Sequence, residues 1–554
     1  MTAAATAFAA GAAREASSPH GALAAAAAHC PANEFLHVPA SATKGYAPGA
    51  LTLTYADALR DADAIAARYR SAGIGAGHRV ALLLENRPAY FLHWFALNAL
   101  GASVVPVNPD SRVAEVAYLL AHSEAVLAVG LPSRIDDLRA AARDAGGGIV
   151  VAGHEDAEAG IARLPRPAEP GVPDRKAECA LMYTSGTTGK PKGCLLSNDY
   201  FLRMGLRYLD RRGYVQLEPG RSRVLTPLPM FHMNAMAGST MGMVMSASCL
   251  IQLDRFHPRS FWQDVAATRA TGIHCLGVMP AMLLGLPVVP EERQHQVRYG
   301  TAAAVDAKHH AAFEARFGFP LIEGWAMTET GAGAAIGADA EPRHLGTRCF
   351  GKAPPEIEVR FVDEQGNDVP DGEPGEMLVR RRGADPRLGF FSGYLKDDAA
   401  AHAGWAGGWW HTGDVACRWP DGTLHFVDRR KNVIRRSGEN ISALEVEEAL
   451  RAHPAVAHVA VTAVPDDIRG EEVMACVVPS GKGDAAIART LFDWADERLA
   501  YFKAPGWIAF VRELPVTATQ KVQRGALREQ AAGLRGDAHD LRPLKQRQRK
   551  GEKA

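Results

Sequence analysis

The chain has 554 residues, more than one average domain, and its 47% hydrophobic and 22% charged residues are typical of globular enzymes. Its 62 basic residues balance its 62 acidic residues, so overall charge gives no support to nucleic-acid binding. The eight cysteines form no C-x-x-C pair and no metal-ligand spacing, which fits free thiols in a reducing compartment.

The alanine-rich start, residues 1–29, lacks the basic region and the continuous apolar core of a signal peptide. We expect a loose leader there, followed by a surface helix. Farther along, residues 224–253 carry no charge, but Pro227, Pro229, His232 and Asn234 interrupt their first part. These interruptions predict a buried segment rather than a membrane span. We therefore expect a soluble, cytoplasmic protein.

Between residues 53 and 129, amphipathic stretches alternate with short apolar runs. The stretches ADALRDADAIAARYRSAG, AYFLHWFALNALG and VAEVAYLLAHSE have helical periodicity, and RVALLLEN, VVPVN and AVLAVG read as strands. Strands that alternate with helices of this length predict an α/β fold, with a parallel sheet covered by helices. The Gly- and Pro-rich residues 153–176 are expected to form an exposed connection.

After Gly351 the pattern changes. EIEVRFVDEQGNDVPDGEPGEMLVRR alternates apolar and polar residues around turn residues, which predicts a β-rich subdomain of antiparallel hairpins, and GTLHFVDRR is a further strand. From residue 441 onward, helical and strand-like stretches predict a small α+β unit. The basic final residues, LRPLKQRQRKGEKA, are expected to be a solvated tail.

The motifs YTSGTTGKPKG (183–193), PLPMFH (227–232), GWAMTET (324–330), GEMLVR (375–380), GWWHTGD (408–414), VDRRKNVIRRSGENIS (427–442) and TATQKVQR (517–524) follow one another along the chain. In this order they resemble the acyl-adenylating superfamily of acyl-CoA synthetases, peptide-synthetase adenylation domains and beetle luciferases. The resemblance spans residues 51–528. It implies a large N-terminal domain, 1–430, and a small mobile C-terminal domain, 431–554.

The first motif is a phosphate-binding loop unlike a Walker loop, because only two residues separate Gly186 from Gly189 and Pro191 follows Lys190. Glycines let a backbone approach an anion closely, and hydroxyls donate hydrogen bonds to phosphate oxygens. The resemblance implies that this loop holds the β- and γ-phosphates of ATP through Thr184, Ser185, Gly186, Thr187, Thr188, Gly189 and Lys192. For Lys190 we expect only a contribution to the local field.

The resemblance also implies the remaining nucleotide contacts. Glu329 corresponds to a magnesium ligand, a hard carboxylate suited to a cation that bridges phosphate oxygens. Thr328 is expected to touch the α-phosphate, and Trp325, where the family commonly has tyrosine, to stack on adenine. Asp414 is the expected acceptor of the ribose hydroxyls, with Arg429 as its ribose or phosphate partner.

Lys521 resembles the lysine that reaches the substrate carboxylate and the α-phosphate while adenylate forms, where negative charge accumulates. The family has glycine before this lysine, whereas this chain has Gln520, which puts the loop's geometry in question.

The resemblance further implies a rotation of the C-terminal domain about a hinge at Lys431 between two half-reactions. The rotation moves Lys521 away from the active site and brings in a loop that opens a tunnel for the pantetheine arm of CoA. This loop corresponds to Ser437, Gly438, Glu439 and Asn440, and a side chain at Gly438 would crowd the path of the thiol.

Residues around the acyl group are less closely defined. His232 resembles a residue that gates access of the carboxylate and the thiol. The Met-rich segment after PLPMFH is expected to line the acyl pocket through Met236, with Gly300 and Thr301 beneath it. Ala326 stands where the family usually has glycine, and its methyl group predicts a short or narrow pocket. RFGFPLIEGWAMTE and DDIRGEEV look most like the crotonobetaine/carnitine-CoA ligase branch.

The function expected from this resemblance is ATP-dependent acid–thiol ligation, through an acyl-adenylate, with AMP and pyrophosphate released. ATP, Mg²⁺, CoA and a small carboxylic acid are its expected cofactor and substrates, without a membrane or nucleic-acid partner. The alternatives are the loading of a carrier protein in trans, since no carrier domain follows Arg528, a luciferase-like monooxygenase, and an inactive ligand-binding paralogue. The acid's identity and a homodimer stay open.

Overall fold

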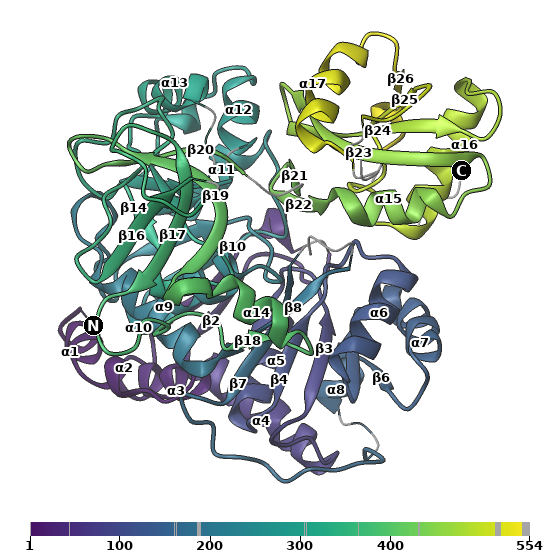
Figure 1. The fold of residues 1–554 in the computed structure, drawn as a ribbon. Coiled ribbons are helices and arrows are strands. Elements are labelled where there is room, and N and C mark those ends of the chain that lie inside the picture. The colour runs from purple at the N-terminus through teal and green to yellow at the C-terminus, as the bar shows by residue number, and fades with distance from the viewer. Residues whose placement is uncertain are drawn as a thin grey trace.

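The protein is described by a computed structural model. The described residues are 2–43, 45–159, 161, 163–184, 190–276, 278–303, 305, 307–363, 365–429, 433–515 and 522–545. They form a main body, residues 2–429, and a smaller C-terminal unit, residues 433–545, which Figure 1 shows in yellow-green at the upper right.

Two mostly parallel sheets build the main body, and helices cover them (Figure 1). One has the order β14 (Ile336–Gly337), β13 (Leu321–Trp325), β12 (Tyr299–Ala302), β11 (Gly272–His274), β9 (Arg223–Thr226), β10 (Cys249–Gln252), β1 (Glu34–Val38), β2 (Leu51–Thr54). The other has the order β18 (Gly393–Tyr394), β8 (Lys192–Ser197), β7 (Glu178–Thr184), β4 (Ser103–Pro106), β3 (Arg79–Leu83), β5 (Leu127–Gly130), β6 (Val150–Gly153). Only the edges β2, β14, β8 and β18 pair antiparallel.

The helices of the main body are α1 (Thr2–Ala10), α2 (Ala12–Glu15), α3 (Pro19–His29), α4 (Tyr55–Ser71), α5 (Pro88–Ala99), α6 (Val113–Ser123), α7 (Ile135–Asp144), α8 (His154–Ala159), α9 (Asn198–Asp210), α10 (Met241–Met245), α11 (Phe261–Ala267), α12 (Val278–Leu284), α13 (Ala307–Phe317) and α14 (Asp398–Gly404). Local sequence explains where two of them begin. Thr54 and Asp57 form a reciprocal capping box at α4, and Pro88 occupies the first turn of α5. The alternation predicted for residues 53–129 is confirmed.

The β-rich subdomain is an antiparallel sheet, as predicted. Its order is β15 (Cys349–Gly351), β20 (Leu424–Arg429), β19 (Trp410–Arg418), β17 (Gly375–Arg381), β16 (Ile357–Val362). The predicted exposed connection at 153–176 is partly wrong, because its start completes β6 and forms α8 before irregular backbone follows.

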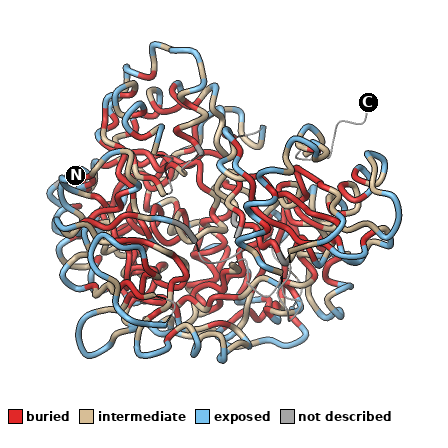
Figure 2. Tube along the Cα trace, turned by 45° about the horizontal axis from the view of Figure 1, so that its top comes forward, coloured by how far each residue is buried: buried red, intermediate tan, exposed pale blue. Residues whose placement is uncertain are grey.

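The loose leader predicted at the N-terminus is wrong. Helices α1 to α3 pack on the main body, and Phe8 and Leu23 are fully buried in its core. Figure 2 shows buried residues through the interior of the molecule and exposed residues along its outer turns. Alanines account for this, because their small side chains let helices approach closely while each methyl group still removes apolar surface from water. The surface helix expected after the leader corresponds to α3, which buries one face in the core through Ala22, Leu23 and Ala26.

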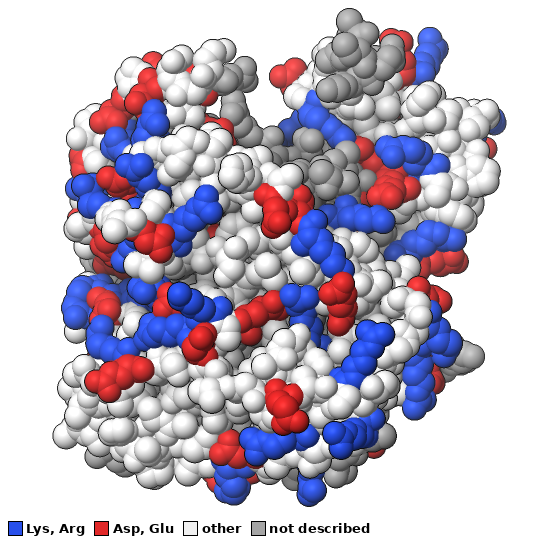
Figure 3. All heavy atoms as spheres, turned by 60° about the horizontal axis from the view of Figure 1, so that its bottom comes forward, with Lys and Arg blue, Asp and Glu red and all other residues white. Residues whose placement is uncertain are grey.

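The uncharged stretch 224–253 is buried, as predicted. It contains β9, a π-helical turn η4 (Asn234–Thr240), α10 and β10. Within the described part of the chain, no helix combines the length and apolarity needed to cross a bilayer. On the face that Figure 3 presents, basic and acidic side chains are interspersed, in line with the balanced net charge.

The C-terminal unit has a sheet and hydrophobic cores of its own. Its elements are β21 (Val433–Arg436), β22 (Glu439–Ser442), α15 (Ala443–Arg451), β23 (Val456–Asp466), β24 (Gly470–Pro479), α16 (Ala485–Arg498), β25 (Trp507–Phe510), α17 (Arg524–Leu534) and β26 (His539–Asp540). The boundary predicted at 430/431 lies outside the described residues, and the division 1–430 and 431–554 stays a prediction.

Candidate active site

Two cavities meet where strands β7 and β13 of the main body end. A small cavity of about 260 Å³ lies beside the ends of β12 and β13 and helix α9. A wide cleft of about 620 Å³ lies between the main body and α15 and α16 of the C-terminal unit. Thr184, His232, Met233 and Thr328 line both. Carboxyl ends of parallel strands are where open α/β sheets place their ligands. A third cavity, about 740 Å³ beside α11 and α12, contains none of the predicted residues.

The predicted phosphate loop connects β7 to β8 at this junction. Thr184 closes β7, and Ser185, Gly186, Thr187, Thr188 and Gly189 lie outside the described residues. Lys190 lines the wide cleft, with its Nζ 5.6 Å from the centre of the Tyr118 ring. Lys192 forms an ion pair with Asp397 at 3.0 Å and lies 5.0 Å above the Tyr394 ring. Lys190 therefore adds positive charge near the loop, whereas Asp397 offsets the charge of Lys192.

Glu329 follows β13 and lines the small cavity, with only 7% of the residue exposed. The Tyr394 hydroxyl donates a hydrogen bond of 2.7 Å to its Oε1. Burial, together with this carboxylate, raises the pKa of Tyr394 far above its ordinary value, so the hydroxyl remains a donor. A single oriented carboxylate suits Mg²⁺, which keeps most of its coordination for water and substrate phosphates. Glu329 therefore fits the predicted magnesium ligand.

Trp325 and Asp414 form a buried pair. The indole Nε1–H of Trp325, the last residue of β13, donates a hydrogen bond of 2.9 Å to Asp414 Oδ2 on β19. Trp325 lines the small cavity, and Asp414 is 2% exposed. Arg429 is the backbone partner of Asp414 across β19 and β20. The indole thus orients the carboxylate predicted to accept ribose hydroxyls, a link between the two motifs that the sequence does not reveal.

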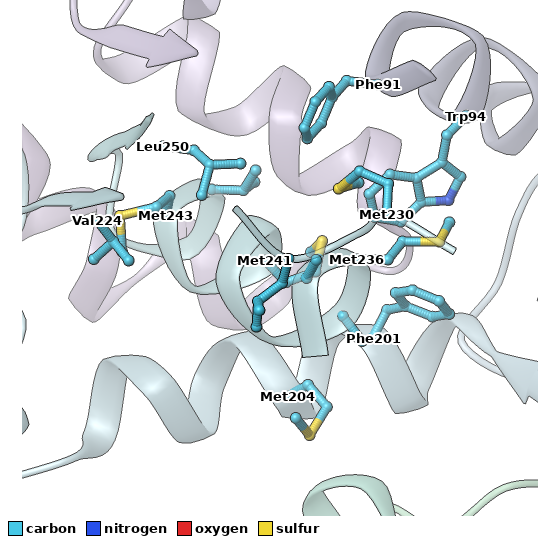
Figure 4. Packing of buried hydrophobic residues seen from close by; sticks show 14 of the residues in the cluster. Phe91, Trp94, Phe201, Met204, Val224, Met230, Met236, Met241, Met243 and Leu250 are labelled. Carbon is cyan, nitrogen blue, oxygen red and sulfur yellow. The ribbon is translucent and has the colours of Figure 1, made fainter. Parts of the chain in front are cut away.

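Of the four residues predicted to surround the acyl group, the small cavity contains two, Thr301 and Ala326. Gly300 is buried in β12 beneath the cavity, and its missing side chain leaves room for Leu321. Met236 is fully buried in the core among other methionine and aromatic side chains (Figure 4). The helical turn that carries it contacts the cavity at its first residues, Met233 and Asn234.

The predicted tunnel loop reaches the same junction from the C-terminal unit. Gly438, in the turn between β21 and β22, lines the small cavity, and Glu439 lines the wide cleft. Glu439 Oε2 lies 3.5 Å from His232 Nε2. Ser437 receives a 3.4 Å hydrogen bond from Arg469, and Asn440 pairs with Arg435 in the hairpin. Lys431 and Lys521 lie outside the described residues.

Sequence reasoning missed helix α9 and the residue that follows it. Met204, Arg207, Tyr208 and Arg211 all line the small cavity. Their spacing, i, i+3, i+4 and i+7, places them on one face of a helix. That periodicity was available in the sequence, but nothing local shows that this face borders a cavity rather than solvent.

Residues 25–395 match the AMP-binding enzyme family, and residues 445–521 match the AMP-binding enzyme C-terminal domain. The chain is 31% identical to the crotonobetaine/carnitine–CoA ligase of Citrobacter koseri, over 85% of this chain and 92% of that protein. It is 32% identical to the sulfoacetate–CoA ligase of Cupriavidus necator, over 85% of this chain and 91% of that protein.

The fold is that of o-succinylbenzoate CoA synthetase from Bacillus subtilis. A double mutant bound to a product analogue superposes with a TM-score of 0.78 at 23% identity, covering 92% of this chain and 98% of that chain. The complex of the same synthetase with its acyl-adenylate intermediate superposes with a TM-score of 0.64 at 24% identity, covering 91% of this chain and 97% of that chain.

A main body of helix-covered sheets, with strand ends that converge on a small cavity next to a separate α+β unit, defines the class of adenylate-forming ligases. The chain belongs to the AMP-binding enzyme family. It is an ATP-dependent acid–thiol ligase that forms acyl-CoA through an acyl-adenylate, with ATP, Mg²⁺ and CoA. The alternatives weighed from the sequence are not favoured.

Proposed function

We propose that this ligase acts on a small, compact carboxylic acid that is bound in the small cavity and receives CoA through the wide cleft. The observation that carries this proposal is the junction of the two spaces at Thr184, His232 and Thr328. An acid in the small cavity would present its carboxylate at that junction, where a thiol in the cleft can reach it. The cavity of about 260 Å³ is below the usual range of ligand pockets, and its walls include Trp325, Thr328 and Glu329, to which the nucleotide is assigned. The space left for the acid argues against a long acyl chain.

The proposed roles follow from position and chemistry. Glu329, held by Tyr394, would hold Mg²⁺, which when bound neutralises phosphate charge. Thr184 and Lys192 would contact phosphate oxygens, and Asp414 the ribose hydroxyls. These assignments rest on the sequence motifs. The hydrogen bonds from Tyr394 to Glu329 and from Trp325 to Asp414 hold the two carboxylates in fixed positions, which supports them.

We also propose that the described arrangement of the C-terminal unit is the one used for thiol transfer. Gly438 and Glu439 at the junction support this, since they belong to the predicted tunnel loop. The better superposition on the product-analogue complex than on the acyl-adenylate complex agrees with it. Rotation about Lys431 would then bring Lys521 to the site for the first half-reaction.

Lys503 is expected to stabilise this arrangement. Its Nζ lies 2.6 Å from Glu115 on α6 and 2.8 Å from Glu445 on α15, so one cation joins the two parts. Replacing Lys503 by methionine would leave two half-buried carboxylates facing each other without a counterion. We expect thioester formation to slow about 10- to 100-fold, as the loss of roughly 1.5–3 kcal/mol implies, with adenylate formation unchanged.

The measurement is the rate of each half-reaction, namely ATP–pyrophosphate exchange and thioester formation from supplied acyl-adenylate. Lys482→Met, at an exposed lysine of the same unit, is the matched control and should match wild type in both. Equal slowing of both half-reactions by Lys503→Met would contradict the assignment.

The proposed function is tested by AMP release across a panel of short, branched, aromatic, betaine-type and fatty acids, with and without CoA. CoA-dependent release confined to small acids is the expected result. Release that is greatest with long fatty acids would contradict the size limit. Pyrophosphate exchange without CoA-dependent turnover would instead point to a carrier protein as acceptor.

We place the enzyme in the cytoplasm, since all eight cysteines are unpaired and buried, as a reducing compartment allows. A homodimer stays a prediction, and light scattering of the purified chain tests it.

A further inference from the structure

Arg207 is a cation in the wall of the small cavity that has no partner. Among the described residues, no hydrogen bond, ion pair or ring contact engages its guanidinium. Burial, followed by the charge of the neighbouring Arg211, lowers the pKa of Arg207 to about 10, and Asp339 and Glu356 offset only part of this. The side chain is still charged at neutral pH. A desolvated charge without a counterion is costly, and a bound anion would relieve that cost.

The neighbouring charges do not supply this anion. Arg211 also lines the cavity, but Asp339 accepts two hydrogen bonds from it, at 2.7 and 3.2 Å, which neutralises its charge. Among the described residues that line the cavity, the one acidic residue is Glu329, which accepts a hydrogen bond from Tyr394 and is the proposed magnesium ligand. At the α9 end of the cavity, Arg207 therefore contributes an unmatched positive charge.

Helix α9 is fixed at both ends, so the position of Arg207 is well defined. Near its start, the Tyr200 hydroxyl donates a hydrogen bond of 2.9 Å to the carbonyl of Thr328, beside the reaction centre. After its end, Arg211 is held by Asp339. Tyr208 packs so closely over Gly238 and Gly242 that a side chain at either glycine would meet its ring.

The spacing along α9 suits a compact ligand. Arg207 lies seven positions after Tyr200, which corresponds to about 10 Å along a helix. Arg207 and Thr328 both line the small cavity. One small molecule can therefore have its reacting carboxylate at Thr328 and its other end at Arg207.

We propose that the acid carries a second anionic group, a carboxylate or a sulfonate, which Arg207 binds on the α9 side of the small cavity. This inference rests on the proposed function of that cavity. It disfavours acids with a quaternary ammonium group, since a fixed cation would face the guanidinium. A guanidinium fork suits both planar carboxylates and the oxygens of a sulfonate.

Four acids of similar size test the charge preference by ATP–pyrophosphate exchange: malonate and sulfoacetate with a second anion, propionate with a neutral end, and glycine betaine with a cation. We expect kcat/KM for malonate or sulfoacetate to exceed that for propionate by about 10- to 100-fold, the effect of one charge-assisted hydrogen bond, and no turnover of glycine betaine. The ratio between malonate and sulfoacetate identifies the anionic group.

Arg207→Met should remove that preference while leaving the kcat/KM for propionate within about threefold of wild type. Arg203→Met is the matched control, because Arg203 lies on the same helix but pairs with Asp199 and does not line the cavity. It should keep the wild-type preference. Two results overturn the proposal: equal use of propionate and the dianions by wild type, or an equal loss with every acid in Arg207→Met.

Exchange reports only the first half-reaction, so its charge preference is independent of the acceptor. Preserved exchange without CoA-dependent AMP release would reject CoA as the acceptor, yet leave the role of Arg207 intact. If no acid supports exchange, calorimetric titration of malonate and sulfoacetate into wild type and Arg207→Met decides the matter. Binding at least tenfold weaker in the variant supports the proposal, whereas equal or absent binding overturns it.

Discussion

Replacing Gly438 by valine is expected to slow thioester formation by at least about 10²-fold. The rate of adenylate formation should stay close to that of wild type. Gly438 has φ +90°, a conformation that β-branched residues rarely adopt. A β-carbon there would also overlap Cδ1 of Leu276, at the wall of the small cavity. The variant would therefore block the arrangement in which the turn between β21 and β22 reaches the junction.

The two half-reactions are measured separately, by ATP–pyrophosphate exchange and by thioester formation from supplied acyl-adenylate. Gly366→Val is a control for backbone strain alone, because Gly366 has φ +86° but nothing lies within 4 Å of the position of its missing side chain. This control should keep both rates. A Gly438→Val enzyme that forms thioester at the wild-type rate would remove the turn from the path of the thiol.

Replacing Lys521 by alanine is expected to have the opposite effect. Adenylate formation should fall about 10²- to 10³-fold, the usual loss when one donor to a developing anion is removed. Thioester formation from supplied acyl-adenylate should be preserved. This expectation comes from the motif TATQKVQR, since Lys521 lies outside the described residues.

Lys482→Ala is the control for loss of a lysine from the C-terminal unit, because Lys482 is exposed and lies outside both cavities. Equal loss of the two half-reactions in Lys521→Ala would refute the assigned role. Restoring glycine at Gln520 gives a further comparison: a faster first half-reaction would mean that glutamine restrains the loop.

Gly438→Val and Lys521→Ala are most informative together. If one rotating unit serves both steps, each variant should lose one half-reaction and retain the other, and an equimolar mixture should convert acid to thioester through released adenylate. Loss of the same step in both variants would contradict two alternating arrangements.

Much of the fold was predictable because it depends on local patterns. Alternating apolar runs and amphipathic stretches predict β3, α5, β4, α6 and β5, since backbone hydrogen bonding and side-chain periodicity act within each segment. The N-terminal helices were missed for the converse reason. An alanine-rich segment has little periodicity to read, and its burial depends on a partner surface formed by distant residues.

The candidate site shows the same division. Glu329, Thr328, Thr184 and His232 could be proposed because their motifs are contiguous. The structure places Thr184, His232 and Thr328 where the two cavities meet, and Glu329 in the wall of the small cavity. Met236 was expected in the acyl pocket because the resemblance implies that its helix lines that pocket. In the structure it lies in the core, because a helix has one face on the cavity and another on the packed interior.

The sequence by itself determined the family, the α/β class and the residues proposed for the chemistry, because each motif places its reactive groups within a few residues of backbone. Only the tertiary structure decided which charges are matched. Arg211 is neutralised by Asp339, 128 residues away, while Arg207, one helical turn earlier on α9, borders the cavity without a partner among the residues that the structure describes. Electrostatic energy depends on distance and burial in space, not on separation along the chain.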